Sequence, residues 1–355
     1  MITAIHQFLP VFARYDAIGE TVLQIQKTIQ SWGYDSEIYV EKPIDQTSKI
    51  SKKYTEYKES KTDLVIYHHS ISSGLANFAC KLKIPKILFY HNITPSHFFE
   101  KYDKSVSTEC YLGRQELEKL VSCFEYTMAV SEYTKTELRT LGFKTILPMQ
   151  YFINLERFDS ITPKNDIITK YQDTTNIIFV GRRSPNKKIE DILKTFAYFK
   201  VFNPKSRLFI LGGSWAIESY QRELEELVRL LCLEDFVFIN TLTDDELASY
   251  YKIADVFLCM SEHEGFCIPL IEAMYFGVPI VAYNSSAIPD TLGGTGILVN
   301  HKKYAEIAMI LDMITSDDSL TKKITSKQKE RLKFYNNKNA TEILQKNIDQ
   351  VISGT

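Results

Sequence analysis

Residues 3–40 read TAIHQFLPVFARYDAIGETVLQIQKTIQSWGYDSEIYV, and they contain two apolar runs separated by a helical pattern. The runs Thr3–Phe8 and Ser36–Val40 are short and rich in apolar residues, which predicts strands. Gly33 lies just past the helical pattern, where a left-handed residue commonly ends a helix. One buried helical face is predicted by apolar residues that step by three or four positions, namely Ile18, Val22, Ile25, Ile29 and Trp32. A strand, a helix and a second apolar strand in this order predict a parallel sheet that helices cover on both faces.

The same alternation continues along the chain and is interrupted once, by the polar segment Asn154–Lys170, which contains Pro163 and is interpreted as a linker or a domain edge. Further strands are predicted at Asp63–His68, Lys86–His91, Tyr126–Val130, Thr145–Leu147, Ile177–Val180, Leu208–Leu211, Phe236–Ile239, Asp255–Cys259, Pro279–Ala282 and Gly296–Val299. Two such series predict an α/β protein with two Rossmann-like, doubly wound domains, residues 1–158 and 159–335, and an active site in the cleft between them. An amphipathic helix within residues 336–355 is expected to pack back on the first domain.

Composition restricts the class of protein. A length of 355 residues fits about two domains, and Lys and Arg number 42 against 44 Asp and Glu, so the net charge of −2 gives no global reason to bind nucleic acid. Six cysteines without a CxxC pair or a Cys/His cluster are interpreted as reduced thiols. No apolar window approaches the roughly 18 residues of a membrane span, and the N-terminus lacks a signal-peptide pattern, so we expect a cytoplasmic protein.

The strongest local pattern is SEHEGFCIPLIEAM, residues 261–274, which follows a predicted strand and opens a helix. The backbone N–H groups at a helix N-terminus bind anions, above all phosphate. Glu272, on the first turn, is placed to accept hydrogen bonds from a ribose diol. The alternative is an exposed loop with two solvated glutamates, Glu264 and Glu272. The strand, glycine, proline and helix that surround them favour a binding site.

A second pattern, FVGRRSPNKKIEDIL, covers residues 179–193. A buried strand ends in Gly181, and Arg182 and Lys187 stand five positions apart in the turn before a helix. A planar guanidinium and a mobile ammonium together suit a diphosphate, whereas the alternative is a solvated basic turn. Both patterns fall at the carboxyl ends of strands in one domain, where open α/β sheets bind ligands. They predict a site for phosphate and ribose.

These motifs resemble those of the retaining GT-B glycosyltransferases of family four, the group 1 glycosyltransferases, which transfer a sugar from a nucleotide-sugar. The resemblance extends in order over nearly the whole chain, and it is most specific in GRRSPNKK (181–188) and EGFCIPLIE (264–272). The segments that resemble the bacterial polysaccharide and O-antigen branch are DAIGE (16–20), YHHS (67–70), YHNITPSHFF (90–99) and AVSEYTKTEL (129–138).

The resemblance implies roles for the matched positions. Arg182 and Lys187 would hold the donor diphosphate and stabilise its developing charge, and Glu272 would bind the ribose hydroxyls. The other implied positions are Gly181 at the strand end, Asp16 and Gly19 near the β-phosphate and acceptor, Glu264 and the amides of Gly265, Phe266 and Cys267 at the donor sugar, and His91 beside the reacting sugar. The chain departs from the family at ARYDAIG, where relatives often carry a Gly-Gly pair, and at Lys188 and Cys267, where glycine is common.

The sequence predicts no metal site and no cofactor. His68 and His69 lack a partner at metal-ligand spacing, and we expect one ring to point into the sheet and the other toward the cleft. The pair Asp244–Asp245 opens a predicted helix, where acidic residues are favoured, and Asp317–Asp318 lies in a polar turn. Neither pair is an Asp-x-Asp at the end of an apolar strand, the arrangement that metal-dependent glycosyltransferases use.

The predicted function is therefore metal-independent transfer of a hexosyl unit, with retention, from a nucleotide-sugar to a glycan or lipid-linked glycan in surface polysaccharide (lipopolysaccharide O-antigen) synthesis. GDP-mannose and dTDP-rhamnose are the favoured donors, followed by UDP-sugars. The alternatives are a nucleotide-sugar 2-epimerase of the same fold and a catalytically silent GT-B binding or scaffold module. A nicotinamide-dependent dehydrogenase is disfavoured because no GxGxxG follows the first strand.

A lipid-linked acceptor implies peripheral contact with the inner face of the plasma membrane. The segment HFFEKYDKS, residues 97–105, is the candidate contact because it sets Phe98, Phe99 and Tyr102 beside Lys101 and Lys104. Packing of these rings in a core is the alternative.

Overall fold

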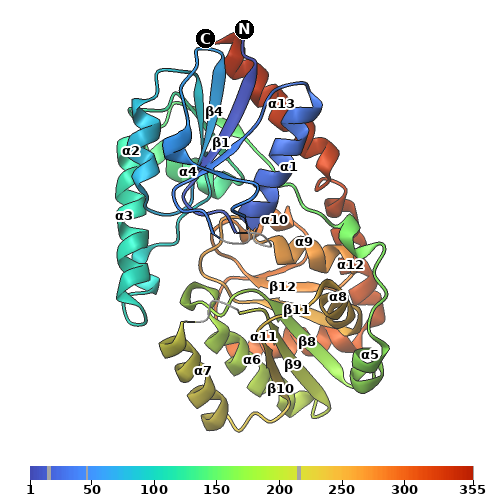
Figure 1. The fold of residues 1–355 in the computed structure, drawn as a ribbon. Helices are drawn as coiled ribbons and strands as arrows, with labels where there is room; N and C mark the ends of the chain where they lie inside the picture. Colours follow the sequence, from blue (N-terminus) through green and yellow to red (C-terminus); the bar gives the residue numbers. More distant parts are fainter. Residues whose placement is uncertain (14–16, 45–46, 214–216, 355) are drawn as a thin grey trace. The chain divides into compact units, whose positions relative to one another are not determined.

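The computed structural model describes residues 1–13, 17–44, 47–213 and 217–354, and the chain forms two compact units. Unit 1 comprises Met1–His97, Lys104–Ile153 and Tyr335–Thr355, and unit 2 comprises Phe98–Asp103 and Asn154–Phe334. Each unit has one parallel β-sheet with helices around it (Figure 1), which confirms the predicted fold class of two Rossmann-like α/β domains. Among the described residues, no helix combines the length and the apolar character that crossing a membrane requires.

Unit 1 contains a seven-stranded parallel sheet in the order β3-β2-β1-β4-β5-β6-β7. The strands are β1 (Ala4–Leu9), β2 (Ile38–Val40), β3 (Lys52–Lys53), β4 (Asp63–His69), β5 (Lys86–Tyr90), β6 (Tyr126–Ala129) and β7 (Thr145–Pro148). The helices are α1 (Ala17–Ser31), α2 (Gly74–Lys81), α3 (Lys104–Leu120), α4 (Glu132–Leu141) and α13 (Asn337–Ser353), with short 3-10 turns η1 (Tyr54–Glu56) and η2 (Ser96–Phe98). In Figure 1, α2 and α3 lie to the left of the labelled strands and α1 and α13 to the right. All residues of β1 and β4 are buried, as expected for central strands covered on both faces.

Unit 2 contains a six-stranded parallel sheet in the order β10-β9-β8-β11-β12-β13. The strands are β8 (Thr175–Val180), β9 (Ser206–Leu211), β10 (Phe236–Ile239), β11 (Val256–Cys259), β12 (Ile280–Tyr283) and β13 (Ile297–Val299). The helices are α5 (Asn165–Tyr171), α6 (Ile189–Phe202), α7 (Glu218–Leu230), α8 (Asp244–Ile253), α9 (Ile268–Tyr275), α10 (Ile288–Leu292), α11 (Tyr304–Ser316) and α12 (Asp318–Leu332), with 3-10 turns η3 (Glu156–Phe158) and η4 (Pro185–Lys187). Because β8 and β11 are neighbours at the middle of this sheet, the loops that follow them emerge side by side.

The segment interpreted as a linker or a domain edge, residues 154–170, begins at the boundary between the units, but it is structured and belongs to unit 2. It contains η3 and most of α5, and Phe158 packs edge-on against Phe276 at 5.0 Å between ring centroids. Tyr171, the last residue of α5, packs against Phe209 at 4.9 Å. These aromatic anchors stabilise a polar segment whose sequence pattern alone indicates a loop.

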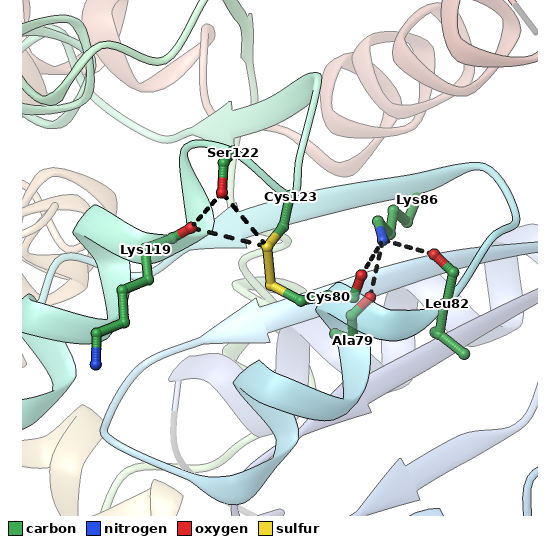
Figure 2. Close-up of a disulfide and its surroundings, with 7 residues drawn as sticks. All are labelled: Ala79, Cys80, Leu82, Lys86, Lys119, Ser122 and Cys123. Atoms are coloured by element: carbon green, nitrogen blue, oxygen red, sulfur yellow. Dashed lines mark hydrogen bonds between the residues drawn. A yellow bond between two sulfur atoms is a disulfide. The ribbon is translucent and has the colours of Figure 1, made fainter.

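The interpretation of all six cysteines as reduced thiols is wrong for one pair. Cys80 and Cys123, 43 residues apart, form a disulfide with a Cα–Cα distance of 5.1 Å (Figure 2). Cys80 lies in the last turn of α2 and Cys123 in the turn after α3, and packing of α2 on α3 brings them together. Nearby, the ammonium of Lys86 donates hydrogen bonds to three carbonyl oxygens at the end of α2, those of Ala79, Cys80 and Leu82. A tertiary contact of this kind leaves no spacing pattern in the sequence; the other four cysteines are free, as predicted.

Candidate functional site

The central feature of unit 2 is an ion pair between Lys187, whose side chain is 17% exposed, and the buried Glu264. Lys187 ends η4, after β8, and Glu264 lies in the loop after β11. The Lys187 Nζ lies 2.6 Å from Glu264 Oε1 and 2.5 Å from Oε2, and Glu264 is 7% exposed. Burial alone would lower the pKa of Lys187, but the Glu264 carboxylate more than offsets it and the pKa is raised. A fixed positive charge therefore stands at the carboxyl ends of two neighbouring strands.

Asn186 connects the two loops that carry this pair. Its side-chain amide donates to the backbone carbonyl oxygen of His263 (2.9 Å). The backbone carbonyl oxygen of Asn186 accepts from the backbone N–H of Glu262 (2.8 Å). The backbone N–H of Glu264 donates to the Ser286 hydroxyl at 2.8 Å. Since all three bonds involve backbone groups, they fix the path of the loop and not only its side chains.

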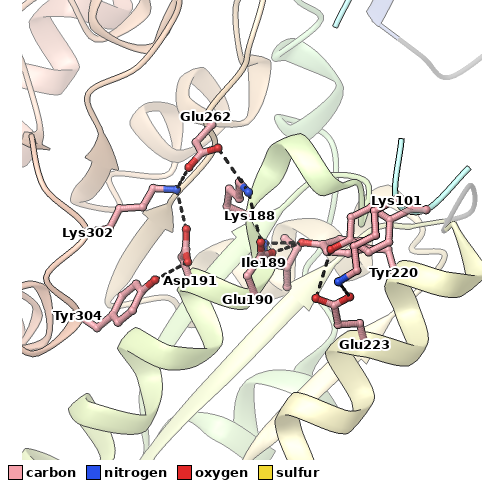
Figure 3. A network of polar contacts seen from close by, with 11 residues as sticks. Lys101, Lys188, Ile189, Glu190, Asp191, Tyr220, Glu223, Glu262, Lys302 and Tyr304 are labelled. Carbon is pink, nitrogen blue, oxygen red and sulfur yellow. Dashed lines mark hydrogen bonds and ion pairs between the residues drawn. The ribbon is translucent and has the colours of Figure 1, made fainter. Parts of the chain in front are cut away.

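A chain of charged groups supports the same loop from the other side (Figure 3). Lys302 lies 2.6 Å from both Asp191 of α6 and Glu262, and Lys188 lies 3.4 Å from Glu262. The Tyr304 hydroxyl donates to the second oxygen of Asp191 at 2.7 Å. The loop after β11 is thus held between α6 and the segment around residue 302.

Glu272, predicted to bind ribose, is buried on α9 and held by two partners. Its Oε1 accepts from Arg157 at 2.5 Å and its Oε2 from the Tyr251 hydroxyl at 2.9 Å. Burial raises the pKa of Glu272, and Arg157 and the Tyr251 hydrogen bond oppose that rise. Arg157 was not predicted as a site residue because it lies in the segment interpreted as a linker or a domain edge.

The start of α9 explains one departure from the family pattern. Cys267 is the residue before the helix and has φ 81°, a left-handed conformation that favours glycine. The family's frequent glycine at this position is therefore understandable, and the cysteine accepts backbone strain to occupy it. Phe266, next to it, is buried, and its carbonyl oxygen accepts a hydrogen bond from the Thr291 hydroxyl. Gly265 lies between these residues and Glu264 in the same loop.

The remaining predicted donor residues differ in their surroundings. Arg182 is exposed beside the Lys187–Glu264 pair, and its charge acts electrostatically on Lys187. Gly181 directly follows β8 with φ 155°, and a Cβ there would lie 3.1 Å from the Phe179 ring. Gly19 is buried in the first turn of α1 in unit 1, and Asp16 lies outside the described residues.

His91 is buried in unit 1 at the end of β5 and belongs to a chain of hydrogen bonds. Gln7 Nε2 donates to the Val22 carbonyl, which leaves Gln7 Oε1 to accept from His68 Nε2 at 3.1 Å. His68 is neutral, since burial lowers its pKa to about 3, so its Nδ1 accepts from His91 Nε2 at 2.9 Å. Burial and the neighbouring histidines hold the pKa of His91 well below its usual value, and its Nδ1 accepts from the Tyr151 hydroxyl at 2.9 Å. Both ring nitrogens of His91 are therefore used within the protein.

The expectation that only one ring of the histidine doublet points into the sheet is wrong. His68 and His69 are both fully buried, on opposite faces of β4. His69 Nε2 donates to the carbonyl oxygen of Gly113 in α3 at 2.9 Å, and burial lowers its pKa to about 4. Two buried polar side chains in an apolar strand need such partners, and α3 and the Gln7 amide supply them.

The segment HFFEKYDKS contributes Phe98–Asp103 to unit 2. Phe99 is 6% exposed, and the Tyr102 ring stacks edge-on against Tyr220 of α7 at 5.1 Å. Lys101 pairs with Glu223 of the same helix (Figure 3). Of the two readings of this segment, core packing is the one that the structure supports.

The two acidic pairs serve helix ends. The Thr243 side chain accepts from the backbone and Glu246 reaches back in a capping box at the start of α8, which contains Asp244 and Asp245. Asp317 accepts from the backbone N–H groups of Ser319 and Leu320 and caps α12. Asp244 and Asp245 thus lie in the first turn of α8, as predicted, whereas the pair predicted to lie in a polar turn, Asp317–Asp318, instead begins α12.

Comparison with known proteins gives a family match that falls within unit 2. The family model described as "Glycosyl transferases group 1" matches residues 161–331. The serotype-specific mannosyltransferase WbdA of Escherichia coli is 23% identical over 230 residues, which are 61% of this chain and 27% of WbdA. O-antigen chain mannosyltransferase B of E. coli is 25% identical over 178 residues, 49% of this chain and 46% of that protein. The chain thus spans less than half the length of both relatives.

Among solved structures, Anabaena Alr3699/HepE in complex with UDP-glucose aligns with a TM-score of 0.71 over 98% of this chain and 99% of its own, at 16% identity. That likeness shows the fold, which is the GT-B fold of two parallel-sheet α/β domains. The family match falls on residues 161–331, which contain Arg182, Lys187, Glu264 and Glu272, and it identifies this region as similar to the group 1 glycosyl transferases.

Proposed function

We propose that this chain transfers a hexosyl unit from a nucleotide-sugar to a glycan acceptor, with retention of anomeric configuration, and that unit 2 binds the donor. The observation that carries this proposal is the Lys187–Glu264 pair at the carboxyl ends of β8 and β11. An open α/β sheet binds its ligand at such an edge. A half-buried lysine with a raised pKa supplies the positive charge that a diphosphate leaving group needs.

Each partner of the pair retains the capacity to bind a donor group. An ammonium has three N–H donors, and the Glu264 oxygens occupy two of those on Lys187. The third is left for a phosphate oxygen, with the Arg182 guanidinium and the amides at the start of α9 as further donors. The Glu264 carboxylate has about four acceptor positions, so it can hold Lys187 and still accept from sugar hydroxyls. Catalysis would consist mainly of stabilising charge on the departing β-phosphate.

The donor is proposed to be GDP-mannose or dTDP-rhamnose, with UDP-sugars as the next choice. The two mannosyltransferase relatives support a mannosyl donor. The structure of HepE in complex with UDP-glucose supports UDP-sugars as the next candidates. The acceptor is proposed to be a glycan or lipid-linked glycan of a surface polysaccharide, and transfer is proposed to take place at the cytoplasmic face of the membrane.

A thermal-shift panel of GDP-, dTDP- and UDP-sugars tests the donor, followed by mass detection of transfer to glycan acceptors. A ligand at 100 times its dissociation constant stabilises the folded state by about 2.7 kcal/mol, which is readily measured. Binding with acceptor-dependent transfer supports the proposal. Conversion of the donor without acceptor would indicate an epimerase, and binding without any turnover a silent module.

Replacing Glu272 by alanine is expected to raise KM for the donor by roughly 10-fold with little change in kcat, because ribose is held equally in the ground and transition states. Arg157→Ala should raise KM less, since Tyr251 continues to orient Glu272. Steady-state kinetics check both, with Glu306→Ala, an exposed glutamate of the same unit, as control. An unchanged nucleotide affinity in Glu272→Ala would contradict the ribose role.

Activity is expected to survive excess EDTA, because the cationic groups named above replace a divalent ion at the diphosphate. Initial rates measured with and without the chelator test this expectation. Loss of activity that Mg²⁺ or Mn²⁺ restores would show that the reaction needs a metal.

A further inference from the structure

A second chemical group adjoins the Lys187–Glu264 pair: two free cysteines. Cys259 is the last residue of β11 and is fully buried, and Cys267 precedes α9 and is half-buried. Their sulfur atoms and a carboxylate oxygen of Glu264 all lie within 4.8 Å of one another. Nothing in the proposed transfer reaction uses a thiol, so this cluster calls for its own explanation.

The geometry is close to that of a tetrahedral metal site. Zn–S bonds of about 2.3 Å and Zn–O bonds of about 2.1 Å place neighbouring ligand atoms roughly 3.6–3.8 Å apart in a tetrahedron. Small side-chain rotations bring atoms that already lie within 4.8 Å to these separations. The three ligands come from a strand end, a braced loop and a helix start, so the backbone already holds them near one point.

The charges also match. Two thiolates and one carboxylate carry three negative charges, which Zn²⁺ and the ammonium of Lys187 neutralise together. Both Glu264 oxygens accept from Lys187, and each has a second lone pair, so one of them can bind the metal while the ion pair with Lys187 is kept. Two sulfur ligands select a soft or borderline cation such as Zn²⁺ or Cd²⁺ over Mg²⁺ or Ca²⁺, which prefer oxygen.

We propose that Cys259, Cys267 and Glu264 form a binding site for one soft divalent cation. The fourth coordination position is left to water. The cation displaces the thiol protons when it binds, so one Zn²⁺ is exchanged for up to two H⁺. A consequence that rests on the proposed function is that the bound cation engages Glu264 and thereby inhibits donor binding. The metal is an inhibitor of this site and not a requirement of the reaction.

The test uses the full chain, freed of metal, with Cys259 and Cys267 as free thiols and the Cys80–Cys123 disulfide intact. It is titrated with Zn²⁺ in calorimetry and with Co²⁺ in absorption. Wild type is expected to bind one ion per chain, and Co²⁺ to give a thiolate charge-transfer band and tetrahedral d–d bands. Cys259→Ser and Cys267→Ser should each weaken binding by roughly 100-fold or more, because a hydroxyl is a poor substitute for a thiolate. Cys232→Ser, which changes an exposed cysteine of the same unit, should bind as wild type does.

A measurement on the unaltered protein guards against variants that fail to fold. Zn²⁺ should protect Cys267 from alkylation by at least 10-fold in rate, while Cys232 is labelled equally with and without metal. Unaltered metal affinity in both serine variants, or equal labelling of Cys267 with metal present, overturns the proposal. Peptide mapping that finds a Cys259–Cys267 disulfide in the reduced, metal-free preparation also overturns it.

Inhibition of donor binding by Zn²⁺ is measured separately, as the affinity for the nucleotide-sugar with and without the metal. If Zn²⁺ binds but the affinity for the nucleotide-sugar is unchanged, the metal site is supported and the proposed inhibition of donor binding is wrong. Intact metal binding in a chain that binds no nucleotide-sugar sustains the site and counts against the proposed function alone.

Discussion

Replacing Lys187 by alanine is expected to lower kcat/KM for the nucleotide-sugar by about 10²-fold or more. Lys187 is half-buried, the pKa of its ammonium is raised, and it lies at the strand ends where the leaving diphosphate is proposed to bind. In a site with little water, the loss of one such charge removes several kcal/mol of transition-state stabilisation. Steady-state rates at saturating acceptor measure it, and Lys303→Ala, an exposed lysine of the same unit, is the control.

The same substitution also leaves Glu264 as a buried carboxylate without its partner, which destabilises the fold. The double variant Lys187→Ala/Glu264→Gln removes that unpaired charge, so its stability should recover while its activity stays low. Arg182→Ala offers an independent comparison, because Arg182 is exposed and its loss should reduce kcat/KM without a change in thermal stability. Near-normal rates in both Lys187→Ala and Arg182→Ala would remove the diphosphate site from these residues.

Much of the donor site follows from local pattern. Lys187 and Glu264 each follow an apolar run that ends in a loop, and parallel strands bring their carboxyl ends to one edge of a sheet. The sequence thus predicts both residues at the same edge, although not that they pair with each other. That pairing depends on Asn186 and Lys302, whose hydrogen bonds set the loop positions, and neither spacing nor composition reveals them.

Other features depend on tertiary packing and were missed for that reason. Arg157 reaches Glu272 from a segment that is polar and lacks helical periodicity over most of its length. The Cys80–Cys123 disulfide joins residues 43 positions apart in a chain with no Cys-rich pattern. The chain from Gln7 to Tyr151 assembles four residues from β1, β4, the end of β5 and the segment after β7. In each case the role of the residue depends on side chains that are distant in sequence and close in space, so the local sequence does not indicate it.

The second large effect is loss of stability of unit 1 in mild acid. His68, His69 and His91 are buried and neutral. Burial is the main cause that lowers the pKa of His68 to about 3, that of His69 to about 4, and that of His91 well below its usual value. In the unfolded chain each histidine binds a proton below about pH 6.5. The unfolded state therefore takes up protons that the folded state does not, and the folded state loses stability as pH falls.

Once the pH is well below 6.5, each such histidine lowers the free energy of unfolding by about 1.4 kcal/mol per pH unit. Three of them together lower it by about 4 kcal/mol per pH unit. Between pH 6.5 and 4.5 the loss amounts to roughly 6 kcal/mol, comparable with the whole stability of an ordinary domain. Unit 2 should be less sensitive, because burial raises the pKa of Glu272 and Asp255, and these carboxyl groups favour the folded state as pH falls.

Hydrogen exchange with mass detection resolves the two units, and urea titrations at pH 6.5, 5.5 and 4.5 give the free energy of unfolding. Peptides from β4 and β5 are expected to lose protection before those from β8 and β11. His69→Gln should reduce the slope of stability against pH by about 1.4 kcal/mol per unit even though it lowers stability at neutral pH. His301→Gln, which changes an exposed histidine, should leave the slope unaltered. A flat profile between pH 6.5 and 4.5 would mean that the buried histidines accept protons in the folded state, and the hydrogen-bond directions assigned from Gln7 through His91 would then be wrong.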